Sequence, residues 1–233
     1  MNRWETKTPE KNSTHGLLNW KTVKKRLPSK SRPILISCGI VRKEIEKLIK
    51  EQKLDVEPVF LDAGLHVVYS ELEKELTSTL EKHAEHASNG IIVVYGDMCY
   101  PRIKKIVKQY SNAVKVDALN CIDCLLGGHQ KLLQADPKCS HFILSPGWMP
   151  SNMKKSPQFR EIFDWDIEGI KEQFEHLEGL IIIDSLDDLD EYKRDIEEFS
   201  TNTGLQVKES KTVGLDGLKA VIDEAIKKLQ NQT

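Results

Sequence analysis

Four residues of this chain combine reactive side chains with a shared position in the sequence pattern. Cys38, His66, Cys99 and Cys121 each lie within a few residues of the end of a short apolar run. Thiolate and imidazole groups bind zinc, and cysteine thiolates also hold iron–sulfur clusters. Three cysteines and one histidine can make a set of four ligands, so we expect a metal or iron–sulfur centre here, with His66 as a fourth or neighbouring ligand or in an acid/base role. Their wide separation in the sequence is unlike a zinc finger and suits a site assembled by a folded sheet.

The apolar runs indicate how these residues come together. The stretch Ile91–Cys99 begins with four apolar residues and ends in a glycine-containing turn, which is typical of a buried parallel strand. Similar runs occur at residues 34–36, 56–61, 114–119, 141–144 and 180–183, with a short seventh run at 205–207, and most are followed by apolar residues at helical spacing. This alternation predicts a doubly wound α/β fold with a mainly parallel sheet and helices on both faces, built as one sheet or as two Rossmann-like lobes around a crevice. Crossover connections bring the carboxyl ends of parallel strands to one edge, where ligands bind.

Further residues near these strand ends are expected to line the crevice. They are Gly39, Gly64, Tyr95, Gly96, Asn120, Gly127 and Trp148. The indole of Trp148 could wall a pocket for a flat ligand, although the sequence allows core packing equally well. No set of glycines completes a dinucleotide-binding or phosphate-binding fingerprint, which disfavours nucleotides.

Two other sequence features concern the cysteines. Cys121 is predicted to begin a helix, whose positive end would favour the thiolate. Cys124 follows one helical turn later, so the two cysteines could form a redox pair, but the apolar residues after Cys124 favour a packing role and make it the less suitable ligand. Cys139, beside Lys138 in an expected loop, is interpreted as incidental.

Composition limits the remaining function classes. The 233 residues have a formal net charge of -2, and no basic stripe with interleaved aromatic residues is present, so nucleic acid is not an expected partner. No apolar stretch reaches the length of a membrane helix, and the first residues lack a secretory pattern. Five cysteines, an odd number, favour reduced thiols. These observations predict a cytoplasmic protein without a membrane partner.

Three segments are expected along the chain. Residues 1–32 are polar and basic and predict a loosely ordered extension. Residues 33–148 form the predicted cysteine-bearing α/β lobe. Residues 149–233 either complete the same domain or form a second lobe.

Five short motifs follow one another in order along the chain. They are Ser37-Cys38-Gly39, Gly64-Leu65-His66, Tyr95-Gly96 with Cys99, Asn120-Cys121 with Leu126-Gly127, and Ser145-Pro146-Gly147-Trp148. On these motifs the chain, from about Ile34 to its C-terminus, resembles the family called domain of unknown function 1638. The resemblance supports Cys38, His66, Cys99 and Cys121 as the marked set. It also implies prokaryotic, mainly anaerobic settings, including those with corrinoid-dependent methyl transfer.

Two functional hypotheses follow, with a third as their alternative. The first is a metal or iron–sulfur protein with a redox or accessory role in anaerobic one-carbon metabolism. The second is a thiolate- or zinc-dependent enzyme, or a corrinoid-linked factor, that acts on a small methyl- or thiol-bearing molecule. A corrinoid would then be bound by the chain or carried by a partner such as a corrinoid protein or methyltransferase. The alternative is a structural or regulatory protein in which the cysteines have no ligand.

Overall fold

The computed structural model describes residues 32–153 and 167–232, apart from the side chains of His66, Pro150, Ile167 and Glu168. The extension expected at residues 1–32 lies outside the described residues except for Arg32, whose guanidinium pairs with Asp55 at 2.7 Å. The described residues belong to one compact unit, Ser31–Thr233.

The first sheet carries the predicted central strand. Its strands are β1 (Ile34–Cys38), β2 (Glu57–Leu61), β3 (Ile91–Val94) and β4 (Ala113–Lys115), in the order β2-β1-β3-β4, and all neighbours are parallel. The two inner strands, β1 and β3, are buried along their whole length, as expected for strands covered on both faces. Ile36 of β1 lies opposite Val59 of β2 and Val93 of β3.

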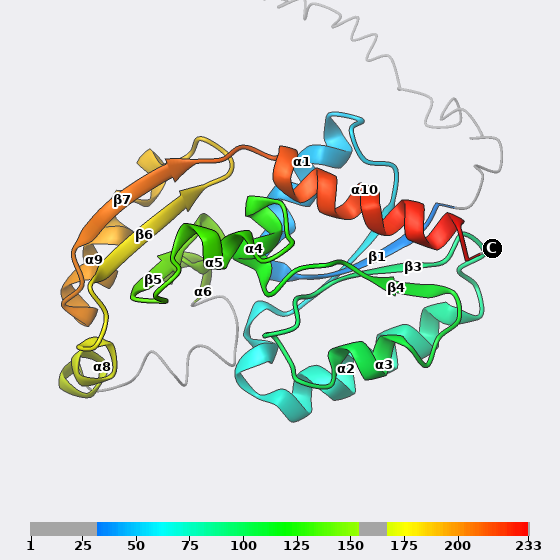
Figure 1. Ribbon diagram of the computed structural model, residues 1–233, viewed down its shortest axis with the longest axis horizontal. Helices are drawn as coiled ribbons and strands as arrows, with labels where there is room; N and C mark the ends of the chain where they lie inside the picture. The colour runs from blue at the N-terminus through cyan, green and yellow to red at the C-terminus, as the bar shows by residue number, and fades with distance from the viewer. Residues whose placement is uncertain (1–31, 154–166, 233) are drawn as a thin grey trace, which may run out of the picture. The chain divides into compact units, whose positions relative to one another are not determined.

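Helices cover both faces of this sheet. They are α1 (Arg42–Lys50), α2 (Tyr69–Ala84), α3 (Ile103–Val107) and the C-terminal α10 (Asp216–Gln230). In Figure 1, α2 and α3 lie on one side of the strands, and α1 and α10 lie on the other. Helix α10 contacts β3, β4 and α4 (Cys121–Leu126), so the last helix of the chain returns to the first sheet.

A second, smaller parallel sheet has the order β5-β6-β7. Its strands are β5 (His141–Leu144), β6 (Gly179–Asp184) and β7 (Val207–Thr212). The two faces of β6 pack into different cores: Ile181 and Ile183 join the main core, whereas Leu180 and Ile182 pack with Tyr192, Phe199 and other residues of the smaller sheet. The α/β fold with parallel sheets is confirmed, in its two-sheet form. Strand β5, which the sequence grouping assigns to residues 33–148, pairs with β6 instead of the first sheet.

Short helices fill the connections. They are η2 (Gly39–Val41), η3 (Ala63–Val67), α5 (Lys131–Ala135), η4 (Pro146–Trp148), α6 (Pro150–Met153), α8 (Ile167–Phe174), η5 (Leu189–Tyr192) and α9 (Lys193–Thr203). Segments η2 and η4 contact each other, which joins the end of β1 to the end of β5.

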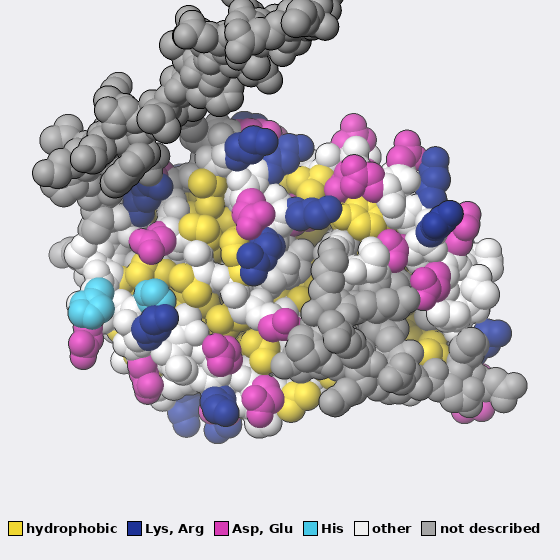
Figure 2. Space-filling view, turned by 180° about the vertical axis from the view of Figure 1, so that it is seen from behind, with side chains coloured by type: hydrophobic (Ala, Val, Ile, Leu, Met, Phe, Trp, Pro, Cys, Tyr) yellow, Lys and Arg dark blue, Asp and Glu magenta, His cyan; other side chains and the backbone are white. Residues whose placement is uncertain are grey.

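Acidic and basic side chains are interspersed on the face seen in Figure 2, in keeping with the small net charge. Among the described helices, none has the length and apolar character needed to cross a membrane.

Candidate functional site

Three of the predicted cysteines line one cavity of about 370 Å³. Cys38 is the last residue of β1, and Cys121 is the first residue of α4, directly after the loop that follows β4. Cys99 lies in the turn after β3, where its backbone N–H donates to the carbonyl of Gly96 at 3.2 Å. The structure therefore brings together three thiols from the carboxyl ends of three neighbouring strands, at the edge where parallel sheets bind ligands.

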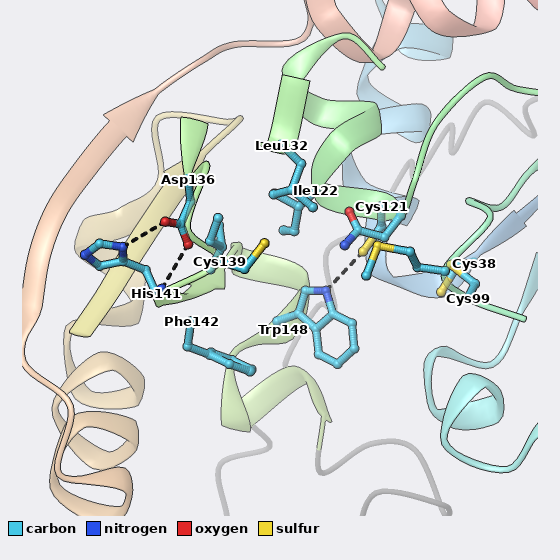
Figure 3. A pocket seen from close by; sticks show the side chains of 13 residues that line it. Cys38, Cys99, Cys121, Ile122, Leu132, Asp136, Cys139, His141, Phe142 and Trp148 are labelled. Carbon is cyan, nitrogen blue, oxygen red and sulfur yellow. Dashed lines mark hydrogen bonds and ion pairs between the residues drawn. The ribbon is translucent and has the colours of Figure 1, made fainter. Parts of the chain in front are cut away.

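The opposite wall of the cavity comes from the second sheet and its flanking loops. Asp136, Cys139, His141, Phe142, Ile143 and Trp148 line it, whereas two further apolar lining residues, Ile122 and Leu132, come from α4 and α5. Figure 3 shows the three thiols on one side of the indole of Trp148 and the Asp136–His141 pair on the other. The cavity thus lies between the two sheets.

Burial governs the protonation of the three thiols. It raises the pKa of Cys38 to about 12, although the backbone N–H of Ile40 and the hydroxyl of Tyr95 oppose the change. Burial also raises the pKa of Cys99, although a backbone hydrogen bond from Gly96 lowers it in part. The pKa of Cys121 is raised well above its usual range by burial and then by the charges of Cys38 and Cys99.

These shifts correct the prediction that the start of a helix makes Cys121 a thiolate. The helix does begin at Cys121, but α4 has only six residues, and burial of the sulfur outweighs its favourable end. Without a compensating charge, the three thiols stay protonated at neutral pH. A protonated thiol is a poor nucleophile and a poor metal ligand until its proton is released.

The indole of Trp148 is hydrogen-bonded to the thiol of Cys121. Its Nε1–H donates a hydrogen bond to the Cys121 sulfur at 3.1 Å, shown as a dashed line in Figure 3. This bond opposes the rise in the pKa of Cys121. Trp148 also packs against both hydrophobic cores, so one side chain connects the Cys121 thiol to the packing of the two sheets.

Some predicted residues lie elsewhere. Asn120 lines the cavity and caps α4 by accepting a hydrogen bond from the Asp123 N–H at 2.9 Å, whereas Gly39 lines a neighbouring cavity. Gly64, Tyr95, Gly96 and Gly127 are not among the residues lining the thiol cavity, although Tyr95 interacts with Cys38. His66 lies in η3 at the end of β2, and its side chain is outside the described part of the structure.

The two remaining cysteines differ from each other. Cys124 is buried in the main core and does not line the cavity, but its charge would interact with those of Cys99 and Cys38. Cys139 is exposed and lines the cavity, and Figure 3 shows its sulfur directed inward, so its interpretation as incidental is incomplete.

Asp136 and His141 are cavity residues that sequence reasoning missed. Asp136 accepts hydrogen bonds from the backbone N–H of His141 at 2.9 Å and interacts with its ring Nδ1 at 3.2 Å. Burial raises the pKa of Asp136, but these bonds and one from the backbone of Ser140 outweigh it, so the net pKa lies below its usual value. In Figure 3 the ring of His141 is turned away from the three thiols. The two carboxylate oxygens of Asp136 are therefore both directed to His141, and the pair fixes the start of β5 at the rim of the cavity.

The thiols do not form a ready site for one ion. Within residues 32–153 and 167–232, and leaving out the undescribed side chains of His66 and Glu168, no three cysteine, histidine or acidic side chains are grouped so that they could hold a metal ion.

A family model matches residues 60–222, and its description is a protein of unknown function, DUF1638. The chain belongs to the DUF1638 family. The matched span includes Cys99, Cys121 and Trp148, whereas the Ser37-Cys38-Gly39 motif lies before it. No curated protein and no solved structure gave a significant match.

Proposed function

We propose that the protein binds an iron–sulfur cluster or a related soft metal centre through the thiolates of Cys38, Cys99 and Cys121, with His66 as the fourth ligand. The observation that carries the proposal is the shared cavity of three thiols whose pKa values are raised by burial. Three thiolates in such a place would repel one another. A bound cationic centre removes that repulsion and favours release of the three protons.

The lack of a grouping for one ion among the described side chains favours a cluster over a single zinc ion. One ion requires its ligands to surround a single point at about 2.3 Å from each sulfur, and the described side chains have no such grouping. A cluster is ligated at separate iron atoms, so its cysteines stand further apart. Zinc remains the alternative if the cysteines and His66 rearrange around it.

Groups near the sulfurs suit a thiolate-bound centre. The indole N–H of Trp148 donates to Cys121, and backbone hydrogen bonds from Ile40 and Gly96 reach Cys38 and Cys99. The buried hydroxyl of Tyr95 interacts with Cys38 and has no other hydrogen-bond partner in the described residues. Hydrogen bonds to ligand sulfurs stabilise their negative charge and tune the reduction potential of a cluster.

The rest of the cavity favours a small ligand beside the centre. A volume of about 370 Å³ is at the lower end of the range for ligand pockets, so a corrinoid would be carried by a partner protein and not enclosed here. A small methyl- or thiol-bearing molecule would fit between the thiols and Asp136. The raised pKa values argue against catalysis by a bare thiolate, so in this second candidate function the thiolate would act while bound to zinc or another metal. In either case we expect the centre to serve anaerobic one-carbon chemistry.

Anaerobic purification with metal and sulfide analysis and an absorption spectrum tests the proposal. We expect stoichiometric iron and sulfide with visible absorption in the native protein, and loss of both in Cys38→Ser, Cys99→Ser and Cys121→Ser. Cys139→Ser is the matched control, because it removes a thiol from the same cavity without removing a proposed ligand. His66→Ala tests the fourth position. Absence of any stoichiometric metal, or unchanged metal content in Cys99→Ser, would contradict the proposal.

A further inference from the structure

A second cavity, of about 260 Å³, is lined in part by the segment that follows Cys38 and the residue that precedes Trp148. Gly39 and Gly147, the chain neighbours of those two residues, line it. The two backbones cross there so closely that a Cβ added to Gly147 would lie 2.0 Å from the carbonyl oxygen of Ile40. This crossing places the second cavity beside the thiol cavity, with a lining of different residues.

The lining of the second cavity includes a buried carboxyl group with an unused oxygen. Glu44 is 1% exposed, and its Oε1 accepts a hydrogen bond from the hydroxyl of Ser185 at 2.6 Å. Its Oε2 has no hydrogen-bond partner within the described residues. Leaving a buried polar atom without a partner costs stability, so such an atom marks a place where a ligand group can bind.

Positive groups face the same space. Arg42 and Lys43 both line the cavity, and Lys43 Nζ donates to the hydroxyl of Tyr192 at 2.5 Å. Each cation also has an acidic neighbour: Lys43 Nζ lies 3.8 Å from a carboxylate oxygen of Asp188, and Arg42 pairs with Glu46 at 3.8 Å. Both side chains are about half exposed, so each keeps N–H donors that a bound anion can reach.

We propose that this second cavity binds the oxyanion group of a small molecule, a carboxylate or a phosphate, between Lys43, Arg42 and the acid form of Glu44. The Glu44 carboxyl donates its proton to the anion from Oε2, while Oε1 keeps the bond from Ser185. Lys43 and Arg42 supply the balancing charge. The inference is independent of any metal at the thiol cavity.

The surroundings of Glu44 favour the protonated carboxyl group, which is the form that can donate a hydrogen bond. Burial raises its pKa, and the charge of Asp188 adds to the rise, whereas the hydroxyl of Ser185 and the charge of Lys43 oppose it. Asp62 is the other acid lining the cavity, and its Oδ1 accepts a hydrogen bond from the Gly64 N–H at 2.8 Å. Anion binding should therefore weaken as pH rises and Glu44 loses its proton.

Calorimetric titration of the full chain with sodium acetate and with inorganic phosphate, each against sodium chloride at equal ionic strength, tests the site. We expect at least one oxyanion to bind with one-to-one stoichiometry. Acetate binding alone would identify a carboxylate ligand, and phosphate binding alone a phosphate ligand. If neither binds, the inference is overturned.

Three variants locate the binding. Lys43→Met should weaken the affinity at least tenfold, whereas Lys47→Met, an exposed lysine one turn later on α1, should leave it unchanged. Equal affinity in the two variants would show general surface binding and overturn the inference.

Glu44→Gln tests the donor. Glutamine keeps an N–H donor in a side chain of the same shape, so this variant should bind the anion with an affinity that no longer falls as pH rises. If the anion affinity of Glu44→Gln falls with rising pH as it does in the native protein, the proposed role of Glu44 is overturned. Circular dichroism establishes that each variant is folded.

Discussion

The indole Nε1 of Trp148 lies 3.1 Å from the sulfur of Cys121 and donates a hydrogen bond to it. The two residues follow strands of different sheets. Cys121 begins α4, after the last strand of the first sheet, and Trp148 ends η4, after β5 of the second sheet. The bond therefore ties the reactive side of the cavity to the second sheet. Any change at Trp148 is expected to affect both the packing and the thiol.

Trp148→Phe tests the energetic coupling in this pair. The substitution removes the N–H donor and leaves the Cys121 sulfur without it, so we expect a loss of about 1 kcal/mol beyond the cost of the smaller ring. A double-mutant cycle with Cys121→Ala, measured by urea unfolding of the metal-free protein, isolates this part. An equal cost of Trp148→Phe in the native and Cys121→Ala backgrounds would show that the bond contributes nothing.

The main strands could be predicted because their burial requires apolar runs. The bounds of β5 agree with the sequence pattern, and β3 begins where the pattern begins. Strand β7 was expected at residues 205–207 but spans Val207–Thr212, because it is an edge strand with mostly exposed polar residues and no apolar alternation. The division into two sheets could not be predicted, since β5 and β6 have the same apolar pattern as strands of the first sheet.

One side of the cavity could be predicted and the other could not. Cys38, Cys99 and Cys121 follow strand ends of one parallel sheet, and that rule is sufficient to bring them together. Asp136 and His141 enter the cavity from the amino end of β5, where the same rule gives no signal. Their partnership depends on the way the two sheets pack.

Gly147→Ala tests the close crossing between η2 and η4. The new Cβ would lie 2.0 Å from the carbonyl oxygen of Ile40, so one backbone must move, and we expect a loss of about 2 kcal/mol or more in unfolding free energy. Gly169→Ala is the control, because a Cβ there meets nothing within 4 Å; in a helix it should stabilise by about 0.5 kcal/mol. Similar unfolding free energies for the two variants in urea would disprove the steric argument.

Asp123→Asn tests the loop that carries Cys121. The buried Asp123 carboxylate accepts backbone hydrogen bonds from Leu119 at 2.8 Å, Leu132 at 2.9 Å and Gln130 at 3.3 Å. The amide of asparagine turns a donor toward these donors, so we expect a loss of about 2 kcal/mol in thermal or urea unfolding.

Asp117→Asn is the control for this change. The Asp117 carboxylate is more than half exposed and pairs with His129, so its replacement should change stability by less than about 0.5 kcal/mol. If Asp123→Asn is as mild as Asp117→Asn, the carboxylate is not what holds the loop.

The buried thiol of Cys38 should make the metal-free protein less stable in alkali. Its pKa is about 12 in the folded chain against the ordinary 9.0, so below pH 9 the thiol is protonated in both states and contributes no pH dependence. As pH rises from 9 toward 12, only the unfolded chain releases the proton, and folding stability falls by up to about 1.4 kcal/mol per pH unit. Cys38→Ala removes this ionisable group, so from pH 8 to pH 10 its unfolding free energy should fall by about 1 kcal/mol less than that of the native protein.

Cys139→Ala, which removes an exposed thiol, is the control. Its unfolding free energy in urea should follow that of the native protein at each pH. Parallel curves for Cys38→Ala and the native protein would mean that the Cys38 thiol is not held in its neutral form, and the electrostatic basis of the proposed thiolate centre would then be lost.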